Sequence, residues 1–392
     1  MGTKARRVSR NNKGGALLIT IFLMAMLAIA ALTAVDTAQT DIELSFNQLH
    51  ADQAFYVAEA GLKRALVELI SYNSWDDGYA GVSFESGAYS VAVAHSDIDS
   101  LIIDTVILRS TATVQDAHAN LEAVVVPRLW YPFQYAVFGK DSIDMINSIN
   151  TDSYNSDSGT YAGTVANTDG DIASNGTIDL VNTATIGGDA SSAVAGGVDV
   201  CATCTVFGDV ESGIDPYDLP IVPDSEYVWA HDNNSAPGGL SGSFSYDGAT
   251  HELTLANNAV ATLSGGTYYF SDINLGSTSD FMVASGEVVR IYMSGDLVVS
   301  SSALVNPTEP PASLQIFSKG DLVAIGMSIE ITAAFYGPGT DVIINNASNF
   351  YGSIIAKSVW MEDAAQVHYD RALMEKPMGT TGEMIMIAWK EI

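Results

Sequence analysis

The sequence predicts an α+β protein. A long N-terminal helix with a small antiparallel sheet is followed by a mainly-β domain, built as a right-handed parallel β-helix or solenoid. Three observations predict this fold. Residues 16–35 are apolar and uncharged, helix-compatible sequence continues to residue 70, and short strand patterns with small or polar corners recur after residue 134. Helical periodicity and coil-length repeats are different signals, so they indicate different parts of the chain.

Charge is distributed unevenly along the chain. The 392 residues include 16 Lys and Arg and 46 Asp and Glu, and five of the basic residues fall within residues 1–15 without an acidic one. The rest of the chain is therefore strongly acidic. Because such a body repels phosphate backbones, we expect no nucleic-acid partner.

The apolar run at 16–35 reads ALLITIFLMAMLAIAALTAV and contains no charge, Pro or Gly. Its length is enough to span the ~30 Å hydrocarbon layer as a transmembrane helix. A signal peptide is the competing interpretation, but this run exceeds the usual ~7–15 apolar residues. The basic side is expected to stay in the cytoplasm. We therefore expect a single-pass inner-membrane protein with its C-terminal domain outside.

Residues 36–70 continue the helix as an amphipathic segment. They contain no Pro, and their only Gly is Gly61. Apolar residues recur mostly at steps of three and four, the spacing of one helical face. These residues are Ile42, Phe46, Leu49, Phe55, Ala58, Leu62, Ala65 and Leu69.

Two segments carry a family resemblance. NNKGGALLITIFLMAMLAIAALTA, residues 11–34, resembles the N-terminus of type IV prepilins and pseudopilins, and AFYVAEAGLKRAL, residues 54–66, resembles PilX-type minor pilins. The resemblance implies a basic leader at 1–15, cleavage by prepilin peptidase after Gly15 and an N-methylated Ala16 as the new terminus. Gly14 is the less favoured cut. The implied partners are other pilins along the helix and the cytoplasmic membrane before assembly into a surface pilus.

Thr20 departs from the family pattern. It occupies the fifth mature position, where major pilins carry a Glu that is thought to neutralise the terminal ammonium of a neighbouring subunit. An unpaired charge inside an apolar fibre is costly, and Thr20 cannot supply the partner. The resemblance therefore implies a low-copy minor subunit, including one at the tip. Alternatively, Thr20 is a tolerated helix residue whose hydroxyl bonds to a preceding carbonyl.

Residues 71–133 are expected to form a pilin-like antiparallel head. Strand-like alternation occurs at 88–94, 105–114 and 119–126. Pro127 and Pro132 flank an aromatic cluster and mark a domain boundary. The acidic β domain is then assigned to residues 134–392.

Repeats predict coils in this second domain. A Gly-Asp pair recurs at residues 170, 188, 208, 295 and 320, and similar phrases are YAVFGKDSIDM, RIYMSGDLVVS, LQIFSKGDLVAI and YGSIIAKSVWM. Spacings of about 18 to 25 residues are typical of one solenoid coil. A β-sandwich with long loops is the alternative. Residues 350–373 also resemble the closing region of pilin-linked, adhesin-like domains.

Catalytic signals are weak. The sequence has no GxSxG, HExxH, P-loop or dinucleotide motif, so an enzyme would rest on fold analogy alone. His231, His251 and His368 are isolated in sequence and are expected to be ordinary surface residues. Lysines at 140, 319 and 357 occupy or adjoin the repeated corner and are interpreted as solvated turn residues.

Two ligand-type patterns remain. Asp152, Asp157, Asp169 and Asp171 lie in Gly-, Asn- and Ser-rich segments whose oxygens suit Ca²⁺, although ordinary solvated turns are favoured over a metal site. No other cofactor is expected. Cys201 and Cys204 are the only cysteines, and they are expected to form a small loop-clamping disulfide outside the cytoplasm.

These observations favour a minor type IV pilus subunit that displays a large extracellular domain for adhesion, with a surface or glycan as ligand, and that is not an enzyme. Two alternatives stay open. One is a membrane-anchored β-helix enzyme acting on polysaccharide, and the other is a minor pseudopilin of type II secretion.

Overall fold

The computed structural model describes residues 13–71, 75–98, 103–377 and 380–392. It divides into two compact units, one with residues up to 128 together with 382–392, and one with residues 129–381. Residues 1–12 of the leader expected at 1–15 lie outside the described residues.

Helix α1 runs without interruption over Lys13–Ser71. At 1.5 Å per residue its length is about 90 Å, and the expectation of one long helix is confirmed. Within the described residues it is the single helix that is long and apolar enough to cross a membrane. Its first part exposes nearly all of its large apolar side chains.

The last part of α1 is buried on one face. Ala54, Ala58, Leu62, Ala65 and Leu69 are in contact with the inner face of an antiparallel sheet. Gly61 sits at the closest approach, because a Cβ there would lie 2.6 Å from Ser110 Oγ and 2.8 Å from Tyr89 Cδ2. The single Gly of this helical segment therefore serves helix–sheet packing.

The sheet has the strand order β1-β2-β3-β4-β29. The predicted strands fall within β2, β3 and β4, and the structure adds an edge strand on each side. The bounds are β1 Tyr79–Phe84, β2 Gly87–Ile98, β3 Ile103–Val114, β4 Ala117–Leu129 and β29 Thr380–Glu391.

Strand β29 corrects the expected domain boundary, which placed every residue after 133 in the second domain. Ile392 N–H donates to the Asn120 carbonyl at 3.0 Å, and Lys390 Nζ lies 2.9 Å from Glu122 Oε1. The pairs 392 with 120 and 390 with 122 show that residue numbers rise along β29 where they fall along β4, so the two strands run antiparallel. The β domain is thus an insertion between two neighbouring strands, which a repeat search cannot detect.

The second unit consists of short strands with few helices. Their bounds are β5 Val137–Ile146, β6 Asn150–Tyr154, α2 Tyr161–Thr164, β7 Ile172–Ser174, β8 Thr177–Val181, β9 Thr185–Ile186, β10 Ala190–Ser192, β11 Val198–Val200, β12 Thr205–Val206, β13 Val210–Ser212, α3 Asp224–Asp232, β14 Leu240–Gly242, β15 Ser245–Asp247, β16 Glu252–Leu255, β17 Val260–Leu263, β18 Gly266–Phe270, β19 Ile273–Leu275, β20 Asp280–Val283, β21 Val289–Met293, β22 Leu297–Val299, β23 Leu304–Val305, η1 Pro311–Ser313, β24 Leu314–Ser318, β25 Leu322–Ile325, β26 Glu330–Ile344, β27 Asn349–Glu362, β28 Gln366–Asp370 and η2 Arg371–Glu375.

These strands stack as parallel coils. Strand β21 pairs in parallel with β18 and β24, and β22 pairs in parallel with β19 and β25. The sandwich alternative is therefore wrong, because the antiparallel pairs of named strands in this unit are confined to β14 and β15. Inward Val, Ile and Leu side chains form one continuous core. The right-handed sense of the coil stays a prediction.

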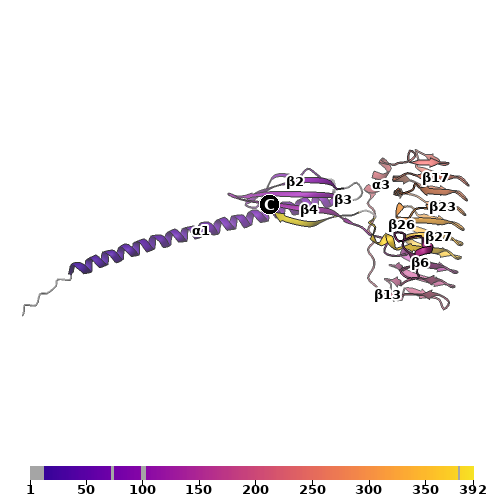
Figure 1. The fold of residues 1–392 in the computed structure, drawn as a ribbon, viewed down its shortest axis with the longest axis horizontal. Helices are drawn as coiled ribbons and strands as arrows, with labels where there is room; N and C mark the ends of the chain where they lie inside the picture. Colours follow the sequence, from indigo (N-terminus) through magenta and orange to yellow (C-terminus); the bar gives the residue numbers. More distant parts are fainter. Residues whose placement is uncertain (1–12, 72–74, 99–102, 378–379) are drawn as a thin grey trace, which may run out of the picture. The chain divides into compact units, whose positions relative to one another are not determined.

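The coils do not stack in chain order. The first coil, β5 and β6, lies between the coil that follows it, β7 to β9, and the last coil, β27 and β28. Figure 1 shows β13, β6, β27, β26, β23 and β17 in this order along the stack. After β13 the chain passes through α3 to the opposite end and then coils back.

The four repeated phrases occupy one corner of the coil. Gly139 is in register with Ala356, and Ala356 with Gly337, while Met293 is in register with Ser318. The repeat found in the sequence is therefore a structural repeat of one strand–corner–strand unit.

Candidate functional site

One outer face of the solenoid carries a row of apolar side chains in register. Pairing aligns neighbouring coils so that the same outward position stacks along the whole row. The row consists of Tyr269, Tyr292, Phe317, Tyr336, Ile355, Phe138 and Ala173. It packs with residues of α3 and of the segment 215–223, which we call the strap.

The strap is fixed at two points. The Asn175 side chain exchanges two 2.8 Å hydrogen bonds with the backbone of Tyr217. Tyr336 Oη donates to the Pro220 carbonyl at 2.6 Å. Burial raises the pKa of Tyr336 well above its ordinary value, so the hydroxyl stays protonated and remains a donor.

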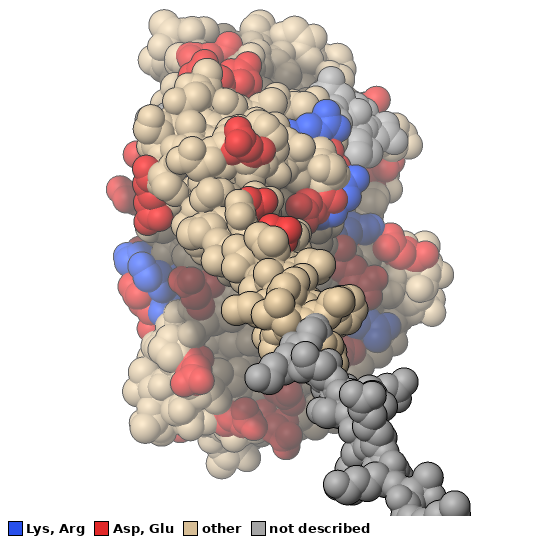
Figure 2. All heavy atoms as spheres, turned by 90° about the vertical axis from the view of Figure 1, so that its left-hand side faces the viewer, with Lys and Arg blue, Asp and Glu red and all other residues tan. Residues whose placement is uncertain are grey.

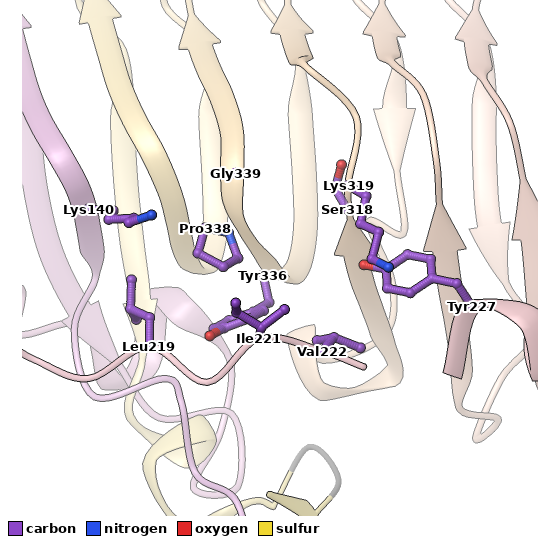
Figure 3. Close-up of a pocket in the computed structure, with 10 residues that line it drawn as sticks. All are labelled: Lys140, Leu219, Ile221, Val222, Tyr227, Ser318, Lys319, Tyr336, Pro338 and Gly339. Carbon is purple, nitrogen blue, oxygen red and sulfur yellow. The ribbon is translucent and has the colours of Figure 1, made fainter. Parts of the chain in front are cut away.

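A pocket of about 460 Å³ opens beside the strap. Its walls are mainly aliphatic and aromatic, with an ammonium group at each end (Figure 3). The lining residues are Leu219, Ile221, Val222, Tyr227, Tyr336, Pro338, Gly339, Ser318, Lys140 and Lys319.

The two lysines come from the repeated corner on different coils. Lys140 lies within β5, directly after Gly139 at the corner, and Figure 3 shows its ammonium directed toward Pro338. Lys319 follows β24, forms an ion pair with Asp224 and lies 4.0 Å from the centroid of the Tyr227 ring. The face of an aromatic ring attracts such a cation electrostatically. Both side chains project outward because they lie at the corner of a coil.

The molecule as a whole is acidic. Figure 2 shows many Asp and Glu and few Lys and Arg on the face in view. The pocket therefore concentrates positive charge on a molecule whose formal net charge is −30. Sequence reasoning missed this site, because it treated the corner lysines as solvated turn residues and had no sign that the strap crosses this face.

A second cluster joins the first and last coils. His368 Nδ1 lies 2.8 Å from Asp152 Oδ1, and Tyr161 Oη donates to Asp152 Oδ2 at 2.7 Å. The His368 and Asp152 side chains are only 3% and 6% exposed. Tyr161 and Tyr351 place their ring centroids 4.4 and 4.5 Å from that of His368. His368 is therefore buried, which corrects its expected surface position.

The four expected calcium ligands are engaged separately. Asp152 is part of the His368 cluster, Asp157 pairs with Lys376 at 2.7 Å, and Asp169 pairs with Arg371 at 3.3 Å. Asp171 accepts a backbone hydrogen bond from Asp189. Asp157 and Asp169 line one small hollow together with Arg371. Within the described residues no group of three or more His, Cys, Asp or Glu is arranged to hold a metal.

His231 and His251 are not isolated from each other in space. Their ring centroids are 4.6 Å apart, and Tyr246 Oη lies 2.6 Å from His251 Nδ1. Cys201 and Cys204 form a disulfide.

The positions expected to guide processing and assembly lie on α1. Gly15 has no atom within 4 Å of a Cβ placed on it, and Ala16 is exposed. Thr20 Oγ1 donates to the carbonyls of Ala16 and Leu17 at 3.1 and 2.9 Å. Its hydroxyl is thus satisfied within the helix.

Comparisons with known proteins are sparse. Residues 241–376 match a family described as a domain of unknown function (DUF7305). A sequence search of the curated proteins finds no match.

Three solved structures show a low level of similarity. The competence-associated pilin ComZ from Thermus thermophilus has a TM-score of 0.32 and 13% identity over 88% of this chain and 97% of its own. An ice-binding protein domain (DUF3494) from Shewanella frigidimarina has a TM-score of 0.35 and 14% identity over 62% and 98%. The ice-binding protein LeIBP from an Arctic yeast has a TM-score of 0.30 and 12% identity over 62% and 94%. These values are too low to assign a shared fold or function.

Proposed function

We propose that the chain is a low-copy type IV pilus subunit, anchored in the inner membrane before assembly, that displays its β domain outside the cell for adhesion. One observation carries the proposal. A single helix, α1, begins as an exposed apolar segment and ends as one layer of a helix-on-sheet head. That is the arrangement expected from the resemblance to type IV prepilins and PilX-type minor pilins.

The exposed apolar half of α1 supports a location in the membrane before assembly and in a fibre afterwards. Large side chains from Leu17 to Val35 are exposed in the isolated chain. Exposed apolar surface costs about 25 cal/mol per Å² in water, so a lipid or helical environment must cover it. The exposed Ile42, Phe46 and Leu49 extend the same requirement beyond the lipid layer, where neighbouring pilin helices supply the cover.

Thr20 supports a low-copy position. Its hydroxyl is satisfied by carbonyls of its own helix and brings no charge. A subunit without the usual acid does not neutralise the terminal ammonium of a neighbour, so a fibre built only from this chain would bury unpaired charges.

We propose display rather than catalysis for the β domain. Among the described residues, the shortest His–Asp contact, 2.8 Å between His368 and Asp152, is covered by Tyr161 and Tyr351. A buried pair that joins two coils fits a structural role, because a general acid or base must reach its substrate.

Processing at Gly15 tests the proposal. Gly15→Leu should block prepilin peptidase, so mass spectrometry should find the chain with its leader and sheared surface fibres should lack it. Gly14→Leu is the matched control and should still yield Ala16 as the terminus. Normal processing of Gly15→Leu, or a mature chain absent from pili, contradicts the proposal; presence in sheared surface pili separates it from a type II secretion pseudopilin.

The insertion offers a test of display. Residues 130–379 connect two neighbouring antiparallel strands, so a short Gly/Ser linker should join β4 to β29 and preserve the head. We expect this variant to be processed and incorporated while cell adhesion falls to the level of a strain without the chain. Unchanged adhesion would assign binding to another subunit.

A further inference from the structure

Lys140 is the unusual charge of the second unit. Six Lys and Arg lie in the described residues 129–377, and the other five all have partners. Lys140 alone among these six has no hydrogen bond or ion pair. The five pairs are Arg290 with Gln315, Lys319 with Asp224, Lys357 with Asp341, Arg371 with Asp169 and Lys376 with Asp157.

Lys140 has no carboxylate partner among the described residues, although the domain around it is acidic. Carboxylates outnumber ammonium groups in this unit, and each of the other lysines lies within 4 Å of a carboxylate. Lys140 instead projects along the pocket beside the strap (Figure 3). Its free ammonium is therefore available to an anion from outside the chain.

The rest of the pocket is apolar. Leu219, Ile221, Val222 and Pro338 line it between the two lysines. Ile221 is 82% exposed although it is a large aliphatic residue held between the fixed positions Pro220 and Asp224. An aliphatic wall with few polar groups selects an apolar ligand body, and the polar groups at its ends fix the orientation.

The far end of the pocket is less available to an anion. Lys319 is already paired with Asp224, whose side chain is 94% exposed, and it lies over the Tyr227 ring. A ligand carboxylate would have to compete with Asp224 there. Lys140 is consequently the stronger of the two anion sites.

We propose that this pocket binds a small amphiphilic carboxylate, with the carboxylate on Lys140 and the apolar body against the strap at Ile221 and Val222. At about 30 Å³ per group of water size, a 460 Å³ pocket holds roughly fifteen non-hydrogen atoms. This site goes beyond the proposed pilus role, and ligand binding does not require assembly into a fibre.

Calorimetry of the full chain in phosphatidylcholine nanodiscs tests the site, with empty nanodiscs as the reference. The probe is phenylbutyrate, and the matched neutral and cationic compounds are phenylbutanol and phenylbutylamine. We expect saturable binding of phenylbutyrate, weaker binding of the alcohol and none of the amine.

Variants locate the binding. Lys140→Gln should weaken phenylbutyrate binding by about tenfold, as expected for the loss of one charge-assisted hydrogen bond. Ile221→Asp should abolish it without affecting folding, because that side chain is exposed. The matched control is Lys357→Gln, since Lys357 occupies the same corner but pairs with Asp341 and does not line the pocket. It should bind phenylbutyrate like the unmodified chain.

Lysine acetylation gives an independent readout. Phenylbutyrate should slow the reaction of Lys140 with an acetylating ester, followed by peptide mass spectrometry, and leave Lys357 unchanged. Equal binding of the amine, an unaffected Lys140→Gln variant, equal protection of both lysines, or no saturable binding of phenylbutyrate would each overturn the proposal. None of these outcomes bears on processing at Gly15, so the two proposals fail separately.

Discussion

Asp171 Oδ1 accepts a hydrogen bond from the backbone N–H of Asp189, on the next coil, at 2.7 Å. The contact repeats, because Asp189 Oδ1 accepts from the N–H of Asp209 at 2.7 Å. At another corner Asp272 accepts from Asp296, whose carboxylate accepts from Leu322. These contacts form two short hydrogen-bond ladders between coils, and three of the four acceptors, Asp171, Asp189 and Asp296, belong to the Gly-Asp pairs found in the sequence.

Asp189 tests the ladder. Asp189→Ala should lower the free energy of unfolding of the β domain by about 1 kcal/mol, because the N–H of Asp209 loses its acceptor. Asp189→Asn keeps an acceptor and should lose less. The midpoint of the β-domain transition in urea measures both. Asp199→Ala is the control, since Asp199 is exposed and outside the ladder; an equal effect there would remove the ladder as the cause.

Gly188 tests why a glycine precedes the aspartate in the Gly-Asp pairs. A Cβ at Gly188 would lie 2.1 Å from Asp171 Oδ1, so Gly188→Ala should destabilise the β domain by about 2 kcal/mol. Because Asp171→Ala removes the clashing carboxylate, the double variant should be less destabilised than the sum of the singles. Additive single effects, measured by urea unfolding, would show that the carboxylate is not the obstacle.

Tyr336 tests the strap. Tyr336→Phe removes the 2.6 Å bond to the Pro220 carbonyl and keeps the ring, so we expect a loss of about 1 kcal/mol. Amide hydrogen exchange should rise in residues 217–222 and stay unchanged in β18. Tyr131→Phe is a matched exposed control. Unchanged exchange in the strap would mean that the bond between Tyr336 and Pro220 does not fix it.

His368 tests the closure between the first and last coils. His368→Ala leaves Asp152 buried without its imidazole partner, so the β domain should lose about 2 kcal/mol or more. A cycle with Asp152→Ala should give a coupling of about 1–3 kcal/mol. His231→Ala, at an exposed site, should change stability by less than about 0.5 kcal/mol. Zero coupling would make the two residues independent.

Asp144 and Asp179 give a pH dependence. They face each other on neighbouring coils, and burial followed by the charge of Asp179 raises the pKa of Asp144. A raised carboxyl pKa means that the folded state holds the proton more tightly than the unfolded state. The stability from this group is therefore present below the ordinary Asp value of about 4 and is lost as pH rises through the raised value.

Asp179→Asn should move the pKa of Asp144 down toward its ordinary value and stabilise the β domain by about 0.5 kcal/mol near neutral pH. Urea unfolding across the acidic range measures the flattened dependence. Asp199→Asn serves for comparison, since Asp199 faces Asp179 and is not among the charges that raise the pKa of Asp144. A pH profile unaffected by Asp179→Asn would contradict this account.

Local patterns predicted what depends on neighbours in sequence. The apolar run at 16–35 and the three- and four-residue spacing beyond it predicted α1, and the burial of Ala58, Leu62 and Leu69 follows that spacing. Repeated corner phrases predicted parallel coils, because each coil repeats the same local sequence of strand, corner and strand. Because these features depend on the local periodicity of the sequence, the sequence alone can specify them.

Long-range pairing was decided only in the tertiary structure. Nothing in the sequence around Asp152 and His368 indicates that they meet, since 216 residues separate them. The same holds for β29, which returns to the sheet beside β4, and for the first coil, which lies between the second and the last. Periodicity fixes the shape of a coil but not which coil covers it. That choice depends on which exposed strand edges and apolar faces remain to be covered, and it creates the strap and the pocket with Lys140.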